Sequence, residues 1–532
     1  MSKATLARSA VLLGLLVWSA PSFAEVQNVK VGGEVNIRGF FRKSLRLSED
    51  TFNGVGGTSI SRVDTSPNSA TSDFGGSGDA FFQQLTALNV NADLTENVSV
   101  ETRFISQKVW TGFGLDATGG AVSSVGSPVA LNLANVTLKE LFYSPLTVKI
   151  GRQKLWFGRG FIVGSRIVNG DVDPGAMLAA DEFSDQTGFD AIRGTLDLSS
   201  VAGLPLTVDG VYAKVTDRTI SGTNSSAAGA GTDVTGAADD LNLVGFNMGT
   251  HFSQWNGEAE AYYWNKRDNG NLGASSASLK HDADANTIGF RGSVAPVEGA
   301  SLWSELAYQW GHRIITTIAG GCLAASGAIQ CTDAEGAAGD PYQAWAANIG
   351  LDYTAKSVAW TPTVGGEWIF YSGDDGTPTP PAGTPGGGSA IGGWDPVFRG
   401  AFKTLIREFQ GVGYYVPAQS GATINGTYNP LTGSTTNQHQ LALHASVKPL
   451  EDLSVDNRLT WFTTDVGIRP TTSPGTKRKS YLGSEWDMVA NYNYTDDVTL
   501  GVIYGVFWPG NVFRAPYDDI AQELVSSVSV KF

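Results

Sequence analysis

Residues 521–532 decide the fold, and they read AQELVSSVSVKF. Successive residues of this segment alternate between the two faces of an extended chain. One face carries Leu524, Val528, Val530 and Phe532, and the other carries Val525, Ser527, Ser529 and Lys531. A repeat of two residues is typical of a β-strand whose faces meet two different environments.

The last residue of the chain is aromatic, which is unusual in a soluble protein. A terminal phenylalanine such as Phe532 resembles the closing strand of bacterial outer-membrane barrels, where that residue lies in an aromatic girdle. Hydrocarbon tolerates no open sheet edge, so such a strand must pair with the first strand. We therefore expect the first and last strands of this chain to lie side by side.

Length and composition favour one large barrel over a set of soluble domains. A soluble chain of 532 residues would form about two to four domains, whereas a membrane barrel needs no compact core. The 66 Gly and 25 Phe, with only 16% charged residues, agree with a barrel. No apolar run of about eighteen residues follows the N-terminus, which excludes a helical membrane protein.

Residues 1–24 are expected to be a secretory signal peptide. Lys3 and Arg8 supply the positive start, residues 10–20 the apolar segment, and residues 22–24 the cleavage site before Glu25. The apolar segment is too short for a membrane anchor. The mature chain is therefore expected to be exported.

Charge and cysteine content narrow the possible partners. A net charge of −15 argues against nucleic acid. The two cysteines, Cys322 and Cys331, lie close together in a polar Gly/Ala stretch, and in an exported protein they favour a local disulfide over a metal pair. Five scattered histidines show no metal-binding spacing, so no cofactor is expected.

Alternating segments recur along the chain. In residues 31–47, Val35, Ile37 and Phe41 share one face, while the other face is polar and carries three arginines. Eighteen strands are expected near residues 31–47, 81–94, 98–110, 131–143, 146–157, 188–198, 206–215, 240–252, 257–267, 286–295, 301–312, 342–353, 358–371, 437–447, 453–463, 481–494, 498–508 and 520–532. Pro362 is a misfit inside one of them, since it lacks the N–H of a ladder hydrogen bond, and a bulge would accommodate it.

The connections between these segments alternate between short and long. Residues 95–97, 253–256 and 495–497 are short connections, whereas residues 48–80, 158–187 and 372–436 are long ones. Short periplasmic turns opposite long extracellular loops are the usual asymmetry of a membrane barrel. We therefore predict an all-β fold over residues 25–532, namely a single transmembrane antiparallel β-barrel of about 18 strands.

Several segments resemble the alginate-export family of outer-membrane porins. They are residues 149–154 (KIGRQK) with the glycines that follow, residues 371–375 (YSGDD), 394–398 (WDPVF), 482–487 (LGSEWD) and 506–510 (VFWPG). Trp394 replaces the phenylalanine usual in that family. The ordered set spans roughly residues 130–532, and the resemblance implies an eighteen-stranded barrel that passes a solute or polysaccharide across the outer membrane.

Inward-facing arginines could carry a polyanion, because the guanidinium fork binds carboxylates bidentately. Alternation predicts inward side chains for Arg38, Arg42, Arg46, Arg103, Arg193, Arg291 and Arg458. Many carboxylates share that face, so these arginines could instead form ion pairs that only stiffen the wall. Arg152 shares the face of the lipid-facing Ile150, so its placement on the solute path follows from the resemblance alone.

One long connection is a candidate constriction or gate. Residues 372–436 are rich in Gly and Pro, and they carry aromatic residues with interspersed cations, which suit sugar rings and carboxylates. The candidate residues are Trp394, Phe398, Arg399, Lys403 and Arg407. The alternative is a loop with no role in transport.

These features predict a channel that is not an enzyme, since no nucleophile-elbow, zinc-protease or phosphate-loop motif is present. We expect a porin or exporter in the bacterial outer membrane that passes polar or anionic solutes, with a saccharide favoured as cargo. The alternative is a barrel that serves as an adhesin or receptor through its long loops. Expected partners are outer-membrane lipid and lipopolysaccharide, the small solute or polysaccharide cargo, and the barrel-assembly machinery.

Overall fold

The computed structural model describes most of the strands and part of the connections between them. The described residues are 28–44, 79–110, 114–115, 121–122, 129–165, 185, 188–199, 205–219, 238–268, 283–313, 323–325, 328–330, 340–373, 393–409, 436–468, 479–513 and 518–532. The predicted signal peptide, Arg46 and both cysteines lie outside them.

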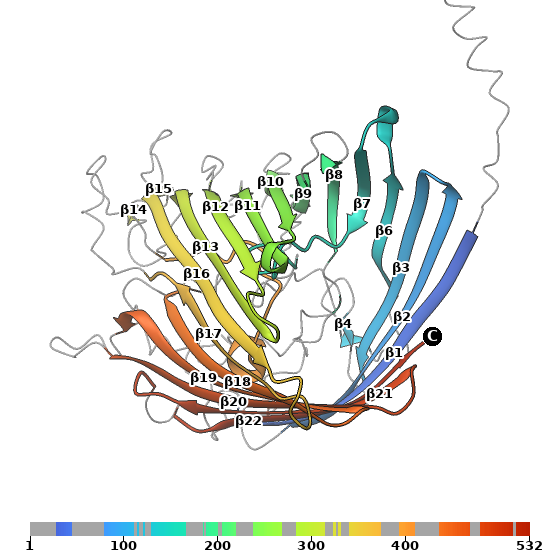
Figure 1. Ribbon diagram of the computed structural model, residues 1–532. Helices are drawn as coiled ribbons and strands as arrows, with labels where there is room; N and C mark the ends of the chain where they lie inside the picture. Colours follow the sequence, from blue (N-terminus) through green and yellow to red (C-terminus); the bar gives the residue numbers. More distant parts are fainter. Residues whose placement is uncertain are drawn as a thin grey trace, which may run out of the picture.

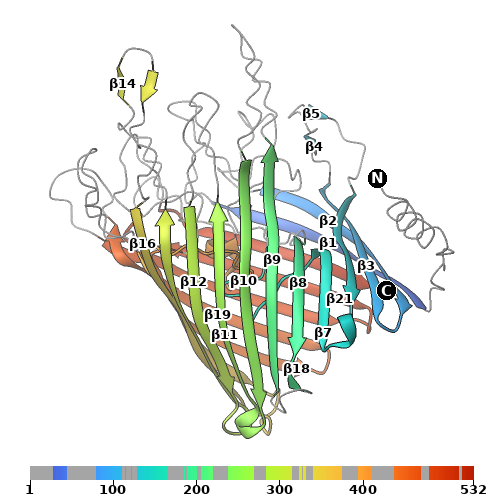
Figure 2. The same ribbon diagram turned by 90° about the horizontal axis from the view of Figure 1, so that it is seen from above.

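Eighteen antiparallel strands form one sheet that closes into a barrel (Figures 1 and 2). The strands are β1 (Asn28–Lys43), β2 (Asp79–Thr95), β3 (Val98–Val109), β6 (Ala130–Leu138), β7 (Leu146–Gln153), β8 (Phe189–Asp197), β9 (Leu206–Thr219), β10 (Ala238–Phe252), β11 (Gly257–Asp268), β12 (Ala283–Val294), β13 (Ala300–Arg313), β16 (Asp340–Thr354), β17 (Thr363–Tyr371), β18 (Gln438–Leu450), β19 (Leu453–Ile468), β20 (Lys479–Asn493), β21 (Val498–Pro509) and β22 (Ala521–Lys531). The predicted strand number and the all-β fold are confirmed.

The remaining elements are short. Two hairpins are formed by β4 (Gly114–Leu115) with β5 (Ala121–Val122) and by β14 (Leu323–Ala325) with β15 (Ala328–Gln330). Single turns of helix occur at η1 (Leu141–Tyr143), η2 (Gln254–Asn256) and η3 (Leu405–Phe409). Within the described chain, no helix has the length and apolar character needed to cross a bilayer.

The seam of the barrel joins the two ends of the chain. β1 pairs with β22 in a register that runs from Glu34 opposite Lys531 to Lys43 opposite Gln522. Gly33 and Phe532 exchange backbone hydrogen bonds of 2.8 and 3.0 Å. The expected pairing of the first and last strands is therefore confirmed.

Alternate residues of each strand differ in exposure. In β22, Leu524 and Val528 are 36% and 42% exposed, whereas the neighbouring Val525 is 1% exposed. Apolar side chains on the exposed face suit contact with lipid, and inward side chains pack within the tube. The alternation read from the sequence thus corresponds to an outer and an inner face.

Short and long connections alternate along the chain. The short turns between the described strands therefore lie at one end of the barrel (Figure 2). That end includes residues 96–97, 253–256 and 494–497, and the long connections leave the opposite end.

The expectation of a bulge at Pro362 is wrong. Pro362 precedes β17, which begins at Thr363, and its carbonyl accepts the backbone N–H of Ala355 in the turn.

Candidate functional site

Two segments from the long-connection end fold inside the barrel. We call residues 154–165, which follow β7, the glycine segment, and residues 393–409, which lie between β17 and β18, the charged segment. Asp395 of the charged segment contacts Lys266 of β11 at 3.0 Å, and its carbonyl accepts a hydrogen bond from Gln309 of β13. Both partners lie on the inward face, so the charged segment reaches the inner wall.

The two segments pair with each other through their backbones. The Phe398 N–H donates to the Ile162 carbonyl at 3.0 Å, and the Gly164 N–H donates to the Phe398 carbonyl at 2.8 Å. A Cβ atom on Gly400 would lie 2.5 Å from the carbonyl carbon of Gly164. Only glycines permit this approach, so the sequence at these two positions determines how closely the segments meet.

An apolar cluster fixes this pair of segments to β8–β17. Phe157 packs on Trp264 with ring centroids 4.8 Å apart, and Phe398 packs edge-on against Phe189 at 5.5 Å. The members contributed by the segments are all buried: Leu155, Phe157, Phe161, Ile162, Val163, Trp394, Val397 and Phe398. Apolar burial therefore holds both segments to the wall.

A buried ion pair organises the rest of the charged segment. Arg399 contacts Glu408 at 2.6 Å, and their side chains are 1% and 0% exposed. Glu408 also accepts hydrogen bonds from Gln440 and from the backbone N–H groups of Lys403 and Thr404. Burial alone would raise the pKa of Glu408, but the Arg399 charge and these donors lower it, so the carboxylate stays ionised.

Two inward carboxyl groups of β20 hold the end of the charged segment. Glu485 accepts the backbone N–H groups of Ile406 at 2.6 Å and Arg407 at 2.9 Å. Asp487 accepts the Leu405 N–H at 3.3 Å. These contacts satisfy donors at the short turn η3, which would otherwise be buried without partners.

The predicted constriction residues divide into anchors and one accessible cation. Trp394, Phe398, Arg399 and Arg407 are between 0% and 2% exposed, so they anchor the charged segment and do not line a passage. Lys403 differs, because 28% of its side chain is exposed and its Nζ lies 3.9 Å from the nearest Glu367 oxygen. The prediction that four of these five residues line the constriction is therefore corrected.

Arg159 of the glycine segment is a second accessible cation, and the sequence reasoning missed it. Its guanidinium lies 3.9 Å from the ring centroid of Trp303, and within the described ranges it forms no ion pair. Burial lowers the pKa of Arg159, and the nearby Arg291 adds to this effect. The two glycines that flank Arg159 in the sequence could have indicated a turn there. In the structure Gly158 and Gly160 both take positive φ values and turn the chain at Arg159.

The arginines predicted on the strands are engaged in contacts. Arg42 pairs with Glu523 at 2.7 Å, Arg193 with Asp209 at 2.9 Å, and Arg458 with Glu367 at 2.7 Å. Arg103 pairs with Glu34 and Asp185, Arg291 pairs with Glu258 and Glu260, and Arg38 donates to Gln83 at 3.3 Å. These contacts fit a stiffening role for the wall, and a role in cargo selection stays a prediction.

Arg152 lies on the outer face of the barrel. The buried Gln153 and Leu155 define the inward face after Gly151, whereas Arg152 shares the side of the exposed Ile150. Its guanidinium forms a bidentate pair with Asp190 of β8, at 2.8 and 2.7 Å. The strand pairing here shows no bulge that would redirect the side chain, so its placement on the solute path is corrected.

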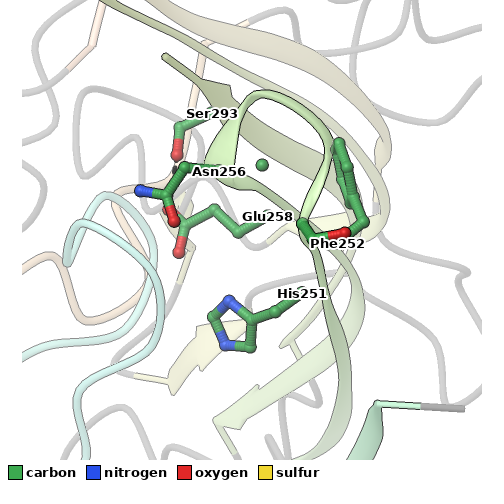
Figure 3. A pocket seen from close by; sticks show the side chains of 7 residues that line it. His251, Phe252, Asn256, Glu258 and Ser293 are labelled. Carbon is green, nitrogen blue, oxygen red and sulfur yellow. Dashed lines mark hydrogen bonds between the residues drawn. The ribbon is translucent and has the colours of Figure 1, made fainter. Parts of the chain in front are cut away.

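A pocket of about 480 Å³ opens at the short-turn end between β10, β11 and β12 (Figure 3). It is lined by His251, Phe252, Ser253, Asn256, Gly257, Glu258 and Ser293. Glu258 accepts hydrogen bonds of 2.8 Å from Ser293 and Arg291, and a Cβ on Gly158 would lie 2.5 Å from the Arg291 Nε. One ion pair therefore separates this pocket from the glycine segment that carries Arg159.

Comparison with known families gives one match. The family model described as alginate export matches residues 237–526, which include the charged segment and the strands β11, β13 and β20 that contact it. The match points to an outer-membrane channel rather than an enzyme. No curated protein sequence matches the chain.

Solved structures of outer-membrane proteins share low sequence identity with the chain. OccAB2 of Acinetobacter baumannii is 12% identical, with 96% of this chain and 99% of that chain covered and a TM-score of 0.47. OccK8 (OprE) of Pseudomonas aeruginosa is 12% identical, with coverages of 95% and 98% and a TM-score of 0.48. OccK2 (OpdF) of Pseudomonas aeruginosa, solved in complex with glucuronate, is 13% identical, with coverages of 95% and 98% and a TM-score of 0.45.

Proposed function

The chain belongs to the alginate export family and is an outer-membrane channel, and from that premise we propose that it passes an anionic or polar saccharide. Arg159 and Lys403 supply the charge selectivity in this proposal. They come from the two segments folded inside the barrel, so a solute that crosses the tube passes close to both. The arginines that form ion pairs on the strands hold the shape of the barrel wall in this proposal.

The accessibility of these two cations is the observation that supports the proposal. Arg159 rests on the face of Trp303 without an ion pair among the described residues, and the nearest carboxylate oxygen to Lys403 Nζ is 3.9 Å away. A uronate carboxylate could therefore approach either cation without breaking a tight ion pair. By contrast, Arg42 is 7% exposed and already bound to Glu523.

Neutral parts of a sugar also find suitable partners along this route. The pocket at the short-turn end offers Asn256, Glu258 and His251, whose polar atoms can bind hydroxyl groups (Figure 3). A saccharide with carboxylates fits this combination better than a simple inorganic anion.

The test is the reversal potential of single channels in a planar bilayer under a salt gradient. A unit charge about 4 Å from an ion in water changes its energy by about 1 kcal/mol, or roughly fivefold in local concentration. Arg159→Ser and Lys403→Ser should each shift selectivity toward cations by up to about this factor. Oligouronates should block the original channel more strongly than neutral oligosaccharides of equal length.

Two controls separate the accessible cations from the rest. Lys356→Ser removes an exposed lysine of a short turn, and Arg42→Met with Glu523→Gln removes a buried pair from the wall. Neither should move the reversal potential. An unchanged reversal potential in Arg159→Ser and Lys403→Ser would contradict the selectivity proposal. The absence of any current would favour the adhesin alternative.

A further inference from the structure

The indole of Trp303, on the inner face of β13, supports the side chain of Arg159. The Arg159 guanidinium lies over the indole, 3.9 Å from the ring centroid. Gly350 of β16 pairs with Trp303, and a Cβ atom at Gly350 would lie 2.2 Å from the Trp303 Cζ2 atom. The indole therefore occupies the space that the missing side chain of Gly350 leaves on the wall.

Hydrogen bonds across three neighbouring strands fix the orientation of this indole. The Trp303 Nε1–H donates to the Asn348 Oδ1 of β16 at 3.1 Å, and the Asn348 Nδ2–H donates to the Glu367 Oε1 of β17 at 3.1 Å. We call Trp303, Asn348 and Glu367 the linking chain. All three side chains are buried, and buried polar groups that bond to one another hold a single arrangement.

The linking chain ends beside the second accessible cation, Lys403. The Glu367 Oε2 accepts a hydrogen bond from Arg458 of β19 at 2.7 Å, whereas the Lys403 Nζ lies 3.9 Å from the Glu367 Oε1. Arg458 and Asn348 thus hold Glu367 in place without help from Lys403, because a charge-assisted hydrogen bond is the stronger contact. The linking chain therefore connects the support of Arg159 to the site of Lys403.

The two cations are near enough for each to act on the charge of the other. Burial lowers the pKa of Lys403, Glu367 opposes this effect, and the charges of Arg458 and Arg159 add to it. Burial also lowers the pKa of Arg159, and the charge of Glu367 is the largest influence that opposes it. Arg159 and Lys403 therefore belong to one electrostatic site around the same carboxylate.

Support by the indole matters because the side chain of Arg159 is long. An arginine has many rotamers, and a solute that binds an unrestrained guanidinium must supply the entropy cost of ordering it. Stacking on Trp303 orders the guanidinium before a solute arrives, which leaves more of the binding energy for the solute. Loss of the indole would leave the charge of Arg159 in the barrel but remove its fixed position.

We propose that Arg159 and Lys403 together bind two carboxylates of one saccharide, and that Trp303 is the positioning residue that holds Arg159 for this task. The inference rests on the proposed passage of an anionic saccharide. Once one carboxylate is bound, the second binds within the same complex, at an effective concentration set by the sugar linkage. The favoured solutes are therefore saccharides with at least two carboxylates, such as oligouronates, over monouronates.

The experiment measures block of single-channel current by a monouronate, by the corresponding diuronate and by a neutral disaccharide of the same size. The diuronate should block at a concentration at least about tenfold lower than the monouronate. In Trp303→Leu this advantage should fall to about twofold, which two independent carboxylates would give. Monouronate block and the reversal potential should stay nearly unchanged there, since both charges remain. Trp303→Phe keeps a ring under Arg159 and should retain most of the advantage.

A matched control is Trp345→Leu, which removes a tryptophan of β16 that is 57% exposed on the outer face and should keep the full advantage. Arg159→Ser leaves the indole in place and must lose the advantage, so it decides the matter if Trp303→Leu forms no channel.

Three results would overturn the inference. An undiminished advantage in Trp303→Leu would mean that the indole does not position Arg159. Equal potency of the two acids in the original channel would overturn this inference alone, because the reversal potentials of Arg159→Ser and Lys403→Ser test the proposed function separately. Block by neither acid would overturn the inference together with the proposed passage of an anionic saccharide.

Discussion

The glycine segment and the charged segment both lie inside the barrel and share one apolar cluster, but only the charged segment is also held by buried charges. The glycine segment relies on backbone hydrogen bonds and on buried aromatics such as Phe157 and Phe161. The charged segment relies on a buried ion pair and on the carboxyl groups of β20. Residue polarity is therefore a poor guide to accessibility here. Arg399 and Arg407 are buried anchors, whereas Arg159 of the glycine segment is accessible.

The sharpest test of this difference is Arg399→Met, which removes the charge that balances Glu408. An unpaired charge left in a buried site costs about 3–5 kcal/mol, so the charged segment should leave its site for part of the time. We expect larger and flickering single-channel conductance. The double variant Arg399→Met, Glu408→Gln should restore much of the quiet conductance, because no unpaired charge remains. Equal noise in the two variants would contradict the role of the ion pair.

The contact between the two segments is tested by Gly400→Ala. The added Cβ would collide with the backbone of Gly164, and overpacking of this kind costs about 1–3 kcal/mol. The expected result is a moderate rise in conductance with fewer flickering events than in Arg399→Met. Gly366→Ala is a suitable control, since its Cβ would meet no atom nearer than 3.6 Å. A normal channel in Gly400→Ala would mean that the segments do not depend on each other.

The smallest effect concerns the protonation of Lys403. Burial lowers the pKa of Lys403, and the neighbouring Arg458 and Arg159 add to the shift, while Glu367 opposes it. A lysine with a lowered pKa carries its charge at low pH and loses it earlier as pH rises. Anion selectivity should therefore fall as pH rises, and the fall should begin at a lower pH than that at which an ordinary lysine loses its charge. Reversal potentials measure this, and Lys403→Arg, which keeps its charge, should show no such fall.

The strands could be predicted because each carries its own evidence. In a wall one residue thick, every strand meets lipid on one side and the interior on the other, so alternation alone reveals it. The start of β17 was misplaced because Trp360 and Thr361 look like strand residues in sequence, although both take positive φ values in a turn. The polarity of the residues around such a turn does not indicate it in the sequence.

The placement of the charged segment could be predicted only in part, because its contacts join residues that are distant in sequence. Nothing near Arg407 in the sequence indicates that its backbone N–H will meet Glu485 on β20. Alternation did identify the correct face for Arg152, and the family resemblance led to the wrong one. The period of a strand is thus better evidence for the direction of a side chain than a motif shared with relatives.

The seam between β1 and β22 has a consequence for biogenesis. Arg42 and Glu523 meet across that seam, and Gly33 exchanges backbone hydrogen bonds with Phe532. Because β1 pairs with β22, the ring cannot be closed until β22 has been synthesised and released. Until then a long, strand-forming polypeptide must be kept from aggregating on its way to the membrane.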